Sequence, residues 1–365
     1  MIGELGIVDS LYEAAVVPEF WKEVLARFCL VVGVRAGALL TFDPGGGVKT
    51  IYTDTYQGVF HDYLARGLQY PNVRPHRALV LHPHKFVTDL DVCTQEELDR
   101  DALYREFYRP YGFGWTAGTA VVSPTKDIIA FDTARLATEG PFSTEEISRL
   151  DQYWPHFARA GLLAQRLGLQ AAHSATEALQ TVGLPAASLT AQGRVVSANA
   201  MFEALSPRVR FGPFDKLSLA DRKADRLLVS ALAGLSASNQ ASVRSIAIPG
   251  SDGMPPLVGH LVPVRRNAHD IFTRSAVLLV VTRVIAPDAP LAEILTGLFD
   301  LTTAEARVAR GIANGLSVED MATKTEVSRE TIRTQLKSVM AKTGTERQTE
   351  LALLLIGARP IPRPL

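Results

Sequence analysis

The spacing of apolar residues changes along the chain and is most regular at its C-terminal end. From Leu301 onward, apolar residues recur every three or four positions in short segments that begin with a capping residue and end near glycine. The pattern predicts four helices, over residues 302–313, 317–325, 328–343 and 346–358. Because only a few residues around Thr325–Ser328 join the second helix to the third, this arrangement is typical of a helix-turn-helix.

The middle of the chain, from about residue 175 to 286, has a different spacing. Apolar and β-branched residues alternate or cluster in short runs separated by Gly, Pro and Asn. The runs on either side of Gly193 predict a hairpin. The expected elements are strands over 184–190 and 194–199, helices over 200–206 and 217–235, and strands over 242–249, 256–265 and 275–284.

The N-terminal segment combines the helical spacing of the C-terminal end with the strand-like alternation of the middle. Helices are expected over 18–32, from Thr94 to Tyr108 and from Ser143 onward, because capping residues or glycine mark their ends. Strands are expected over 36–42, 48–53, 115–123 and 127–135. The last helix continues toward residue 182, and Pro155 is predicted to kink it or to begin a new helix. Its apolar positions keep no strict heptad, so we expect a connector helix rather than a long coiled coil.

The composition excludes several classes of protein. The 38 Lys and Arg residues balance 38 Asp and Glu residues, so nucleic-acid binding would need a local patch. Two cysteines, Cys29 and Cys93, cannot form a disulfide framework and fit a reducing compartment. The acidic N-terminus is unlike a signal peptide, and the longest apolar run is too short to span a membrane. We therefore expect a soluble, cytoplasmic protein.

The third predicted C-terminal helix has a basic face. Ile332 and Leu336 belong to its apolar stripe, whereas Arg329, Arg333 and Lys337 follow one another at intervals of four on the opposite face. Residues 290–365 contain ten Lys and Arg but also nine Asp and Glu. The domain therefore has little net positive charge, but it concentrates basic residues on one helix face, as a protein that reads DNA sequence requires.

About 65 C-terminal residues resemble, in order and without gaps, the LuxR/FixJ-type (GerE) DNA-binding domain of bacterial transcription factors. The shared motifs include Gly315-Leu316-Ser317, Val327-Ser328 and Thr331-Ile332-Arg333. The resemblance implies that the third helix enters the major groove of double-stranded DNA. The DNA-binding residues that it implies are Lys324, Ser328, Arg329, Thr331, Arg333, Thr334, Gln335, Lys337 and Lys342. Gln335 and Thr343 depart from the residues common in the family, so the preferred DNA sequence does not follow.

The two preceding segments resemble sensory domains. Leu189–Asn199 is similar to the opening hairpin and first helix of PAS domains, and the N-terminal element order resembles that of GAF or PAS domains. The expected fold is thus a multidomain α+β chain: a GAF/PAS-like α/β domain with a connector helix (1–170), a PAS-like domain (175–286) and an all-α four-helix helix-turn-helix domain (290–365). Two-fold DNA sites also favour a homodimer.

Candidate ligand residues come from the aromatic N-terminal segment. Tyr52, Tyr56, Phe60, Tyr63, Tyr70 and Trp115 either fill a core or line a cavity, and Arg74 either orients a ligand or anchors a turn. We select Tyr56, Tyr63, Arg74 and Trp115 as candidate ligand contacts. His82-Pro83-His84 with Cys93 matches no closed zinc pattern, so a surface loop is the preferred interpretation and no metal is expected.

The favoured function is a sensory transcription regulator that binds a small molecule or a partner in its N-terminal domains. The alternative is an interaction scaffold with a DNA-tethering domain and no small-molecule ligand. An enzyme fused to a DNA-binding domain is the third hypothesis, but the sequence shows no nucleophile elbow, P-loop or dinucleotide fingerprint. We therefore expect no enzymatic activity and no cofactor.

Overall fold

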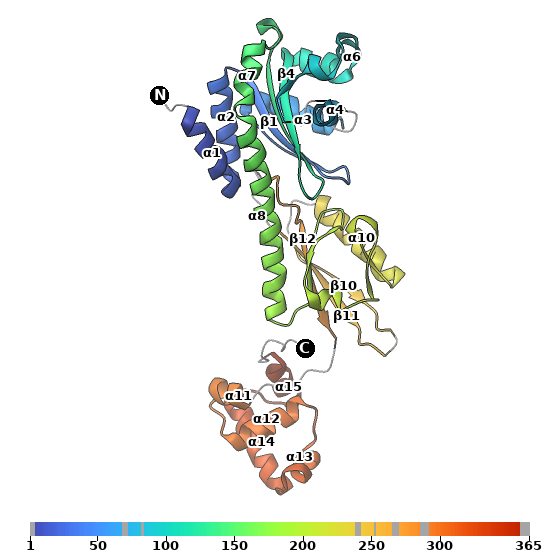
Figure 1. The fold of residues 1–365 in the computed structure, drawn as a ribbon. Coiled ribbons are helices and arrows are strands. Elements are labelled where there is room, and N and C mark those ends of the chain that lie inside the picture. The colour runs from blue at the N-terminus through green and yellow to red at the C-terminus, as the bar shows by residue number, and fades with distance from the viewer. Residues whose placement is uncertain are drawn as a thin grey trace.

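Two sheet-containing domains lie along one long helix, and a helical domain follows at the C-terminal end (Figure 1). This computed structural model describes residues 4–67, 72–81, 84–237, 242–251, 253–264, 270–284 and 292–357. Among the described helices, none is long and apolar enough to cross a membrane. The predicted multidomain mixture of α/β and all-α domains is confirmed.

The first domain is built on an antiparallel sheet with the strand order β2-β1-β5-β4-β3. Its strands are β1 (Ala36–Phe42), β2 (Val48–Tyr52), β3 (Val87–Thr88), β4 (Phe113–Val122) and β5 (Ile128–Leu136). Alternation along β5 divides two cores, because Ile129 and Phe131 face one side while Ala130 and Ala134 face the other.

Helices cover both faces of this sheet. The first core lies beneath α1 (Glu4–Val16), α2 (Trp21–Val32), α7 (Thr144–Asp151) and α8 (Trp154–Thr181), and η1 (Pro18–Phe20) joins α1 to α2. The second lies beneath η2 (Asp54–Tyr56), α3 (Gln57–Ala65), α4 (Arg74–Leu81), α5 (Asp89–Val92), α6 (Gln95–Arg100) and η3 (Tyr104–Tyr108), and η4 (Arg109–Tyr111) leads from η3 to β4. A 3-10 turn, η5 (Ala137–Glu139), follows β5.

Local sequence signals act as predicted at several positions in this domain. Gly33 ends α2 with φ 74°, in the left-handed region that glycine favours. Pro155 lies in the first turn of α8, so a new helix begins there. The helix predicted from Thr94 to Tyr108 is wrong in its middle, because α6 ends where Asp101 becomes extended (φ −66°, ψ 123°).

The second domain contains a five-stranded sheet in the order β10-β11-β12-β6-β7. Its elements are β6 (Ala186–Leu189), β7 (Val195–Ala198), α9 (Ala200–Glu203), β8 (Val209–Phe211), η6 (Pro213–Asp215), β9 (Leu217–Leu219), α10 (Arg222–Ala237), β10 (Arg244–Ile248), β11 (Leu257–Pro263) and β12 (Val277–Arg283). The predicted hairpin and three later strands are confirmed. The helix predicted from Leu217 is wrong at its start, because Leu217–Leu219 pairs with Val209–Phe211 as a strand.

Residues 270–274, which precede β12, pack against the first domain, and we call them the docking segment. Ile271 and Phe272 are buried in the core formed by α1, α2 and α8, and the Phe272 ring lies 5.4 Å from that of Trp21. Gly168 of α8 permits this approach, because a Cβ there would lie 2.9 Å from the Thr273 hydroxyl. The two domains therefore share part of one core.

The C-terminal domain consists of helices packed around a small apolar core. They are α11 (Ala292–Phe299), α12 (Thr303–Ala313), α13 (Val318–Thr325), α14 (Arg329–Thr343) and α15 (Gln348–Gly357). Ile332, Leu336 and Val339 of α14 pack against residues of α12, α13 and α15. The four predicted helices are confirmed as α12 to α15, and α11 is an additional helix.

Candidate nucleic-acid interface and ligand cavity

The helix-turn-helix is fixed by caps at successive helix ends. Ser317 and Asp320 form a capping box at the start of α13, and Glu326 (φ 54°) ends that helix in the left-handed region. Ser328 then accepts a hydrogen bond from the amide of Thr331 (3.1 Å) and begins α14. Only two residues, Val327 and Ser328, therefore separate the turn residue Glu326 from α14.

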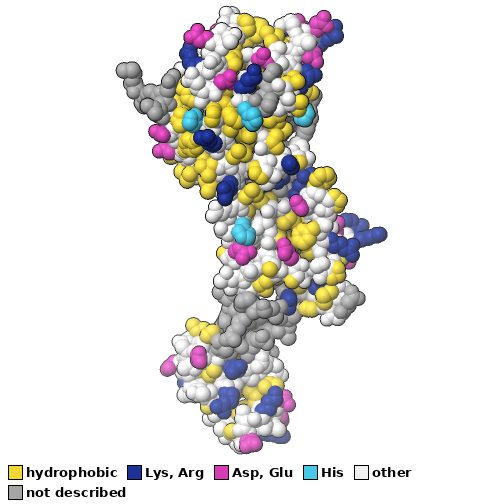
Figure 2. All heavy atoms as spheres, in the orientation of Figure 1, with side chains coloured by type: hydrophobic (Ala, Val, Ile, Leu, Met, Phe, Trp, Pro, Cys, Tyr) yellow, Lys and Arg dark blue, Asp and Glu magenta, His cyan; other side chains and the backbone are white. Residues whose placement is uncertain are grey.

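The basic face of α14 points to solvent. The Arg329 and Arg333 side chains are 66% and 62% exposed, and each lies 3.7 Å from a carboxylate, Glu319 and Glu330 respectively. Lys337 is exposed and forms no ion pair with a described residue. Because exposed ion pairs at this distance are weak, both arginines remain available to phosphate or base edges. Figure 2 shows basic and acidic side chains interspersed on the visible face of this domain.

The other residues predicted to contact DNA differ in how far the protein itself already occupies their polar groups. Lys324 is exposed on α13, while Ser328 and Thr331 bond to each other at the cap (2.9 Å between hydroxyl oxygens). The Thr334 hydroxyl donates to the carbonyl of Glu330 (3.0 Å), and Gln335 is half-buried beside residues of α12 and α13. Thr331 and Thr334 thus present mainly their methyl groups and their second lone pairs.

Lys342 has a structural partner. Its ammonium donates to the Glu305 carboxylate and to the carbonyl of Asp300, both at 2.8 Å. Glu305 also accepts from Ser338 (2.6 Å), and these bonds from Lys342 and Ser338 hold the pKa of Glu305 at about 2. Lys342 therefore ties α14 to the start of α12, a contact that its place in the sequence did not indicate.

A cavity of about 60 Å³ lies in the first domain between the sheet and the helices α3, α4 and α5. Its apolar walls include Leu40, Phe60, Ala78 and Val92. The polar side chains of its lining include Tyr63, Asn72, Arg74, Asp89, Tyr108, Thr116 and Asp132. Because drug-sized ligands occupy about 300–1,000 Å³, the cavity has room only for a compact molecule.

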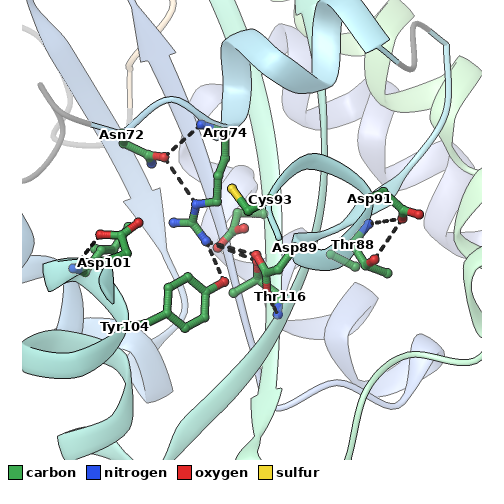
Figure 3. Close-up of polar contacts among 12 residues, drawn as sticks. Asn72, Arg74, Thr88, Asp89, Asp91, Cys93, Asp101, Tyr104 and Thr116 are labelled. Atoms are coloured by element: carbon green, nitrogen blue, oxygen red, sulfur yellow. Dashed lines mark hydrogen bonds and ion pairs between the residues drawn. The ribbon is translucent and has the colours of Figure 1, made fainter. Parts of the chain in front are cut away.

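Arg74 is bound on several sides by protein groups (Figure 3). It pairs with Asp89 (3.1 Å), and it donates to the Tyr104 hydroxyl (2.9 Å) and to the Asn72 side-chain oxygen (3.2 Å). Asp89 in turn accepts bonds from the amide and hydroxyl of Thr116. Since the Arg74 side chain is 11% exposed and that of Asp89 3%, they form a buried, neutralised pair.

Asp132 of β5 is the surplus charge of this cavity. One of its oxygens accepts from the Tyr56 hydroxyl (3.1 Å), and it forms no ion pair with a described residue. Burial raises the pKa of Asp132 to about 7, although the charge of Arg74 opposes this and Asp89 adds to it. The cavity therefore holds one carboxyl group more than its cation balances, which favours a ligand group that donates a hydrogen bond.

The structure brings three of the four predicted ligand residues together. Tyr63 and Arg74 line the cavity, and Tyr56 lies behind it, bonded to Asp132. Trp115 is not among the lining residues; its ring nitrogen donates to the carbonyl of Ala137 (3.3 Å), just beyond the end of β5. Tyr70 lies outside the described residues.

Asp132 was missed by the sequence prediction, although a signal was present. It alternates with Ala130 and Ala134 on a core-facing side of a strand, where an unpaired carboxyl is unusual. Of the residues weighed as a metal site, His84 packs edge-on against Trp154, and no group of three or more His, Cys, Asp and Glu among the described residues could hold a metal ion. His82 lies outside the described residues.

Residues 300–355 match the family described as "Bacterial regulatory proteins, luxR family". The C-terminal part of this chain is therefore a LuxR-family helix-turn-helix domain. No curated protein matches the chain significantly.

Several solved structures are similar over part or most of the chain. The ligand-binding domain of VqsR from Pseudomonas aeruginosa has 14% identity and a TM-score of 0.38, and covers 45% of this chain and 98% of its own. CepR2 from Burkholderia cenocepacia, described as an N-acylhomoserine lactone dependent LuxR family factor, has 16% identity and a TM-score of 0.35, over 45% and 97%. Escherichia coli SdiA has 11% identity and a TM-score of 0.30, over 93% and 90%. Such low scores identify no ligand for this chain.

Proposed function

We propose that this protein is a transcription regulator that reads double-stranded DNA with α14 and responds to a small molecule in its first domain. The observation that carries the DNA-binding part is the exposed row of Arg329, Arg333 and Lys337 on a capped helix of a LuxR-family domain. Both ends of α14 are fixed, by Ser328 and by Gly344 (φ 68°), so the row has a defined direction.

The test of DNA reading compares Arg333 with Lys337. If Arg333 meets a guanine edge, Arg333→Ala costs about 1–3 kcal/mol of binding and relaxes the preference at one base pair. Lys337→Ala is the matched control: as a phosphate contact it weakens all sequences alike and lowers the salt slope by about one. Titration of selected and scrambled DNA at several salt concentrations measures both. Equal, sequence-independent losses would contradict the assignment of Arg333.

The sensory part of the proposal rests on the first-domain cavity. A compact ligand with an apolar body and a hydrogen-bond donor fits its walls and the surplus Asp132 carboxyl. In a thermal-shift screen, a ligand present at one hundred times its Kd adds about 2.7 kcal/mol of stability. Tyr63→Phe removes one lining hydroxyl and should weaken binding, whereas Trp115→Ala, outside the lining, should not. If no compact molecule stabilises the protein, the scaffold hypothesis is favoured.

The proposed assembly is a homodimer, because two-fold DNA sites match a two-fold protein. Leu351 and Leu355 are buried within their own domain, whereas Leu353 (69% exposed) and Leu354 (39% exposed) offer an apolar contact on α15. Sedimentation of wild type and Leu353→Glu, with and without DNA, tests this contact. A wild-type monomer in both conditions would rule the dimer out. The domain limits 1–170, 175–286 and 290–365 stay predictions.

A further inference from the structure

A second, larger cavity of about 650 Å³ lies where the first two domains meet. In the first domain its walls come from the β1–β2 hairpin, the β4–β5 turn and α8. In the second they come from the β6–β7 turn, α10, the docking segment, the end of β11 and the start of β12. The volume is within the range of small-molecule sites, and such sites occur preferentially at domain interfaces.

The walls of this junction cavity are held together by direct bonds. The Thr41 hydroxyl donates to the carbonyl of Ile271 (3.0 Å), and the Lys49 ammonium donates to that of Thr273 (2.5 Å). On the opposite side, the two hairpin turns approach closely, since a Cβ on Gly47 would lie 3.2 Å from the side-chain nitrogen of Gln192. The cavity is therefore a built space rather than a loose gap between domains.

The two domains contribute different chemistry to this space. The first supplies most of the charge, with Asp43, Lys49 and Asp127, and the second adds Arg274. The second domain also supplies the apolar side: Leu235, Pro263, Val264, Phe272, Ala276 and Val277. The lining thus contains two acids, two bases and several apolar side chains, so its formal charges balance.

Asp127 indicates that a hydrogen-bond donor is needed in this cavity. Its side chain is buried (3% exposed), and one oxygen accepts from Thr125 (2.6 Å) and from Gln165. The other oxygen accepts no hydrogen bond from a described residue, and the nitrogen Nε of Arg274 lies 3.6 Å away. Burial raises the pKa of Asp127. A buried carboxylate oxygen without a hydrogen bond is costly, so a ligand that supplies one gains affinity there.

We propose that the junction cavity binds a dipolar ligand, an α-amino acid or dipeptide with apolar side chains. Its ammonium group lies between Asp127 and Asp43, and its carboxylate faces Lys49 and Arg274. Its side chains lie against Val264 and Phe272. A ligand in this place contacts both domains and stabilises their contact, which makes this site distinct from the cavity around Asp132.

The experiment uses the full chain and isothermal titration calorimetry with defined probes: L-leucine, L-phenylalanine and the dipeptides Leu-Leu and Phe-Leu. 4-Methylpentanoate and isopentylamine each lack one of the two charges of leucine. We expect a zwitterionic probe to bind, and each single-charge analogue to bind at least about tenfold more weakly.

Two variants locate the binding. Val264→Trp fills the cavity from a position that is 37% exposed, and Asp127→Asn removes the charge; each should weaken binding by about tenfold or more. Asp132→Asn, in the other cavity, should leave it unchanged. A thermal melt of Val264→Trp confirms that this variant is folded.

Three results would overturn the proposal: no zwitterionic probe binds the wild-type protein at millimolar concentration, the folded Val264→Trp protein binds as well as wild type, or the single-charge analogues bind equally well. Loss of binding in Asp132→Asn alone would assign the ligand to the first-domain cavity instead. DNA binding by α14 is unaffected by any of these outcomes, so the two proposals fail separately.

Discussion

Among the regions of this protein in which arginine and carboxylate side chains meet, the surroundings of Arg74 and the surface of α14 present opposite conditions. Around Arg74 they are buried, the distance to Asp89 is 3.1 Å, and tyrosine, threonine and asparagine groups complete the network. On α14, Arg329 and Arg333 are more than half exposed and lie 3.7 Å from single carboxylates. The first set is therefore saturated by protein partners, and the second is open to an external one.

This difference in burial separates charged side chains that stabilise the fold from those that are available to bind a partner. Desolvation of a buried pair is compensated only by its own bonds, so removal of one member leaves an unpaired charge. An exposed pair contributes little to folding because water and salt screen it. Arg74, although it lines a cavity, consequently resembles a support for the cavity wall more than a receptor for an anion.

The largest expected effect is that of Arg74→Met. The substitution leaves Asp89 buried without its cation, and the free energy of unfolding should fall by about 3–5 kcal/mol. Urea denaturation followed by circular dichroism measures it. Arg77→Met is the control on the same helix, since the pair of Arg77 with Glu97 is exposed and its loss should change stability little. A similar small loss for both variants would contradict the buried role of Arg74.

Asp132 offers a second way to test the buried region, through pH. Its pKa of about 7 in the folded protein exceeds the value near 4 expected of an unfolded aspartate. The folded state then binds more protons between pH 4 and 7, so stability from this group falls as the pH rises through that range. In Asp132→Asn this loss should vanish, so the variant gains stability relative to wild type from pH 4 to pH 8. If the unfolding midpoints of wild type and Asp132→Asn differ by the same amount at every pH in this range, the raised pKa of Asp132 is contradicted.

Some of these features follow from local sequence and some do not. Ser317 and Ser328 each cap the amide three positions later and begin helices as predicted, and Thr302, one of two candidate caps with Thr303, begins α12. In contrast, Arg74 and Asp89 are brought together by a turn of the chain that no local pattern specifies. The helix predicted through Asp101 failed because the aspartate side chain accepts from the backbone of Leu103 and begins a new turn.

The docking segment illustrates the same limit at longer range. Ile271 and Phe272 lie in a short connection before β12, where the pattern indicates a loop. Their partners, such as Trp21, are some 250 positions earlier, so only the folded arrangement of two domains defines their burial. The basic face of α14 was predictable because helical spacing alone placed Arg329, Arg333 and Lys337 together.

The distinction between structural and exposed charges can also be tested within the DNA-binding domain, by comparing Lys342 with Lys337. Lys342→Met removes the tie between α14 and Glu305, so it should lower the thermal midpoint of this domain more than Lys337→Met. Because the folded pKa of Glu305 is depressed to about 2, the stability from this contact is present above about pH 4.5 and is lost as the pH falls toward 2. Melts of the two variants at pH 7 and pH 3 measure this. If Lys342→Met matches Lys337→Met in stability and lowers the salt slope of DNA binding, Lys342 is a phosphate contact instead.

The smallest expected effect belongs to the exposed pair of Arg329 and Glu319. Glu319→Gln should change the free energy of unfolding by no more than about 1 kcal/mol, because the pair is exposed and its atoms lie 3.7 Å apart. The same substitution removes a carboxylate that competes with DNA phosphate for Arg329, so DNA affinity should rise modestly at low salt and the gain should shrink as salt is added. Glu326→Gln on the neighbouring turn changes the net charge equally and serves as the control. Equal gains in both variants would show that general charge, and not release of Arg329, accounts for the effect.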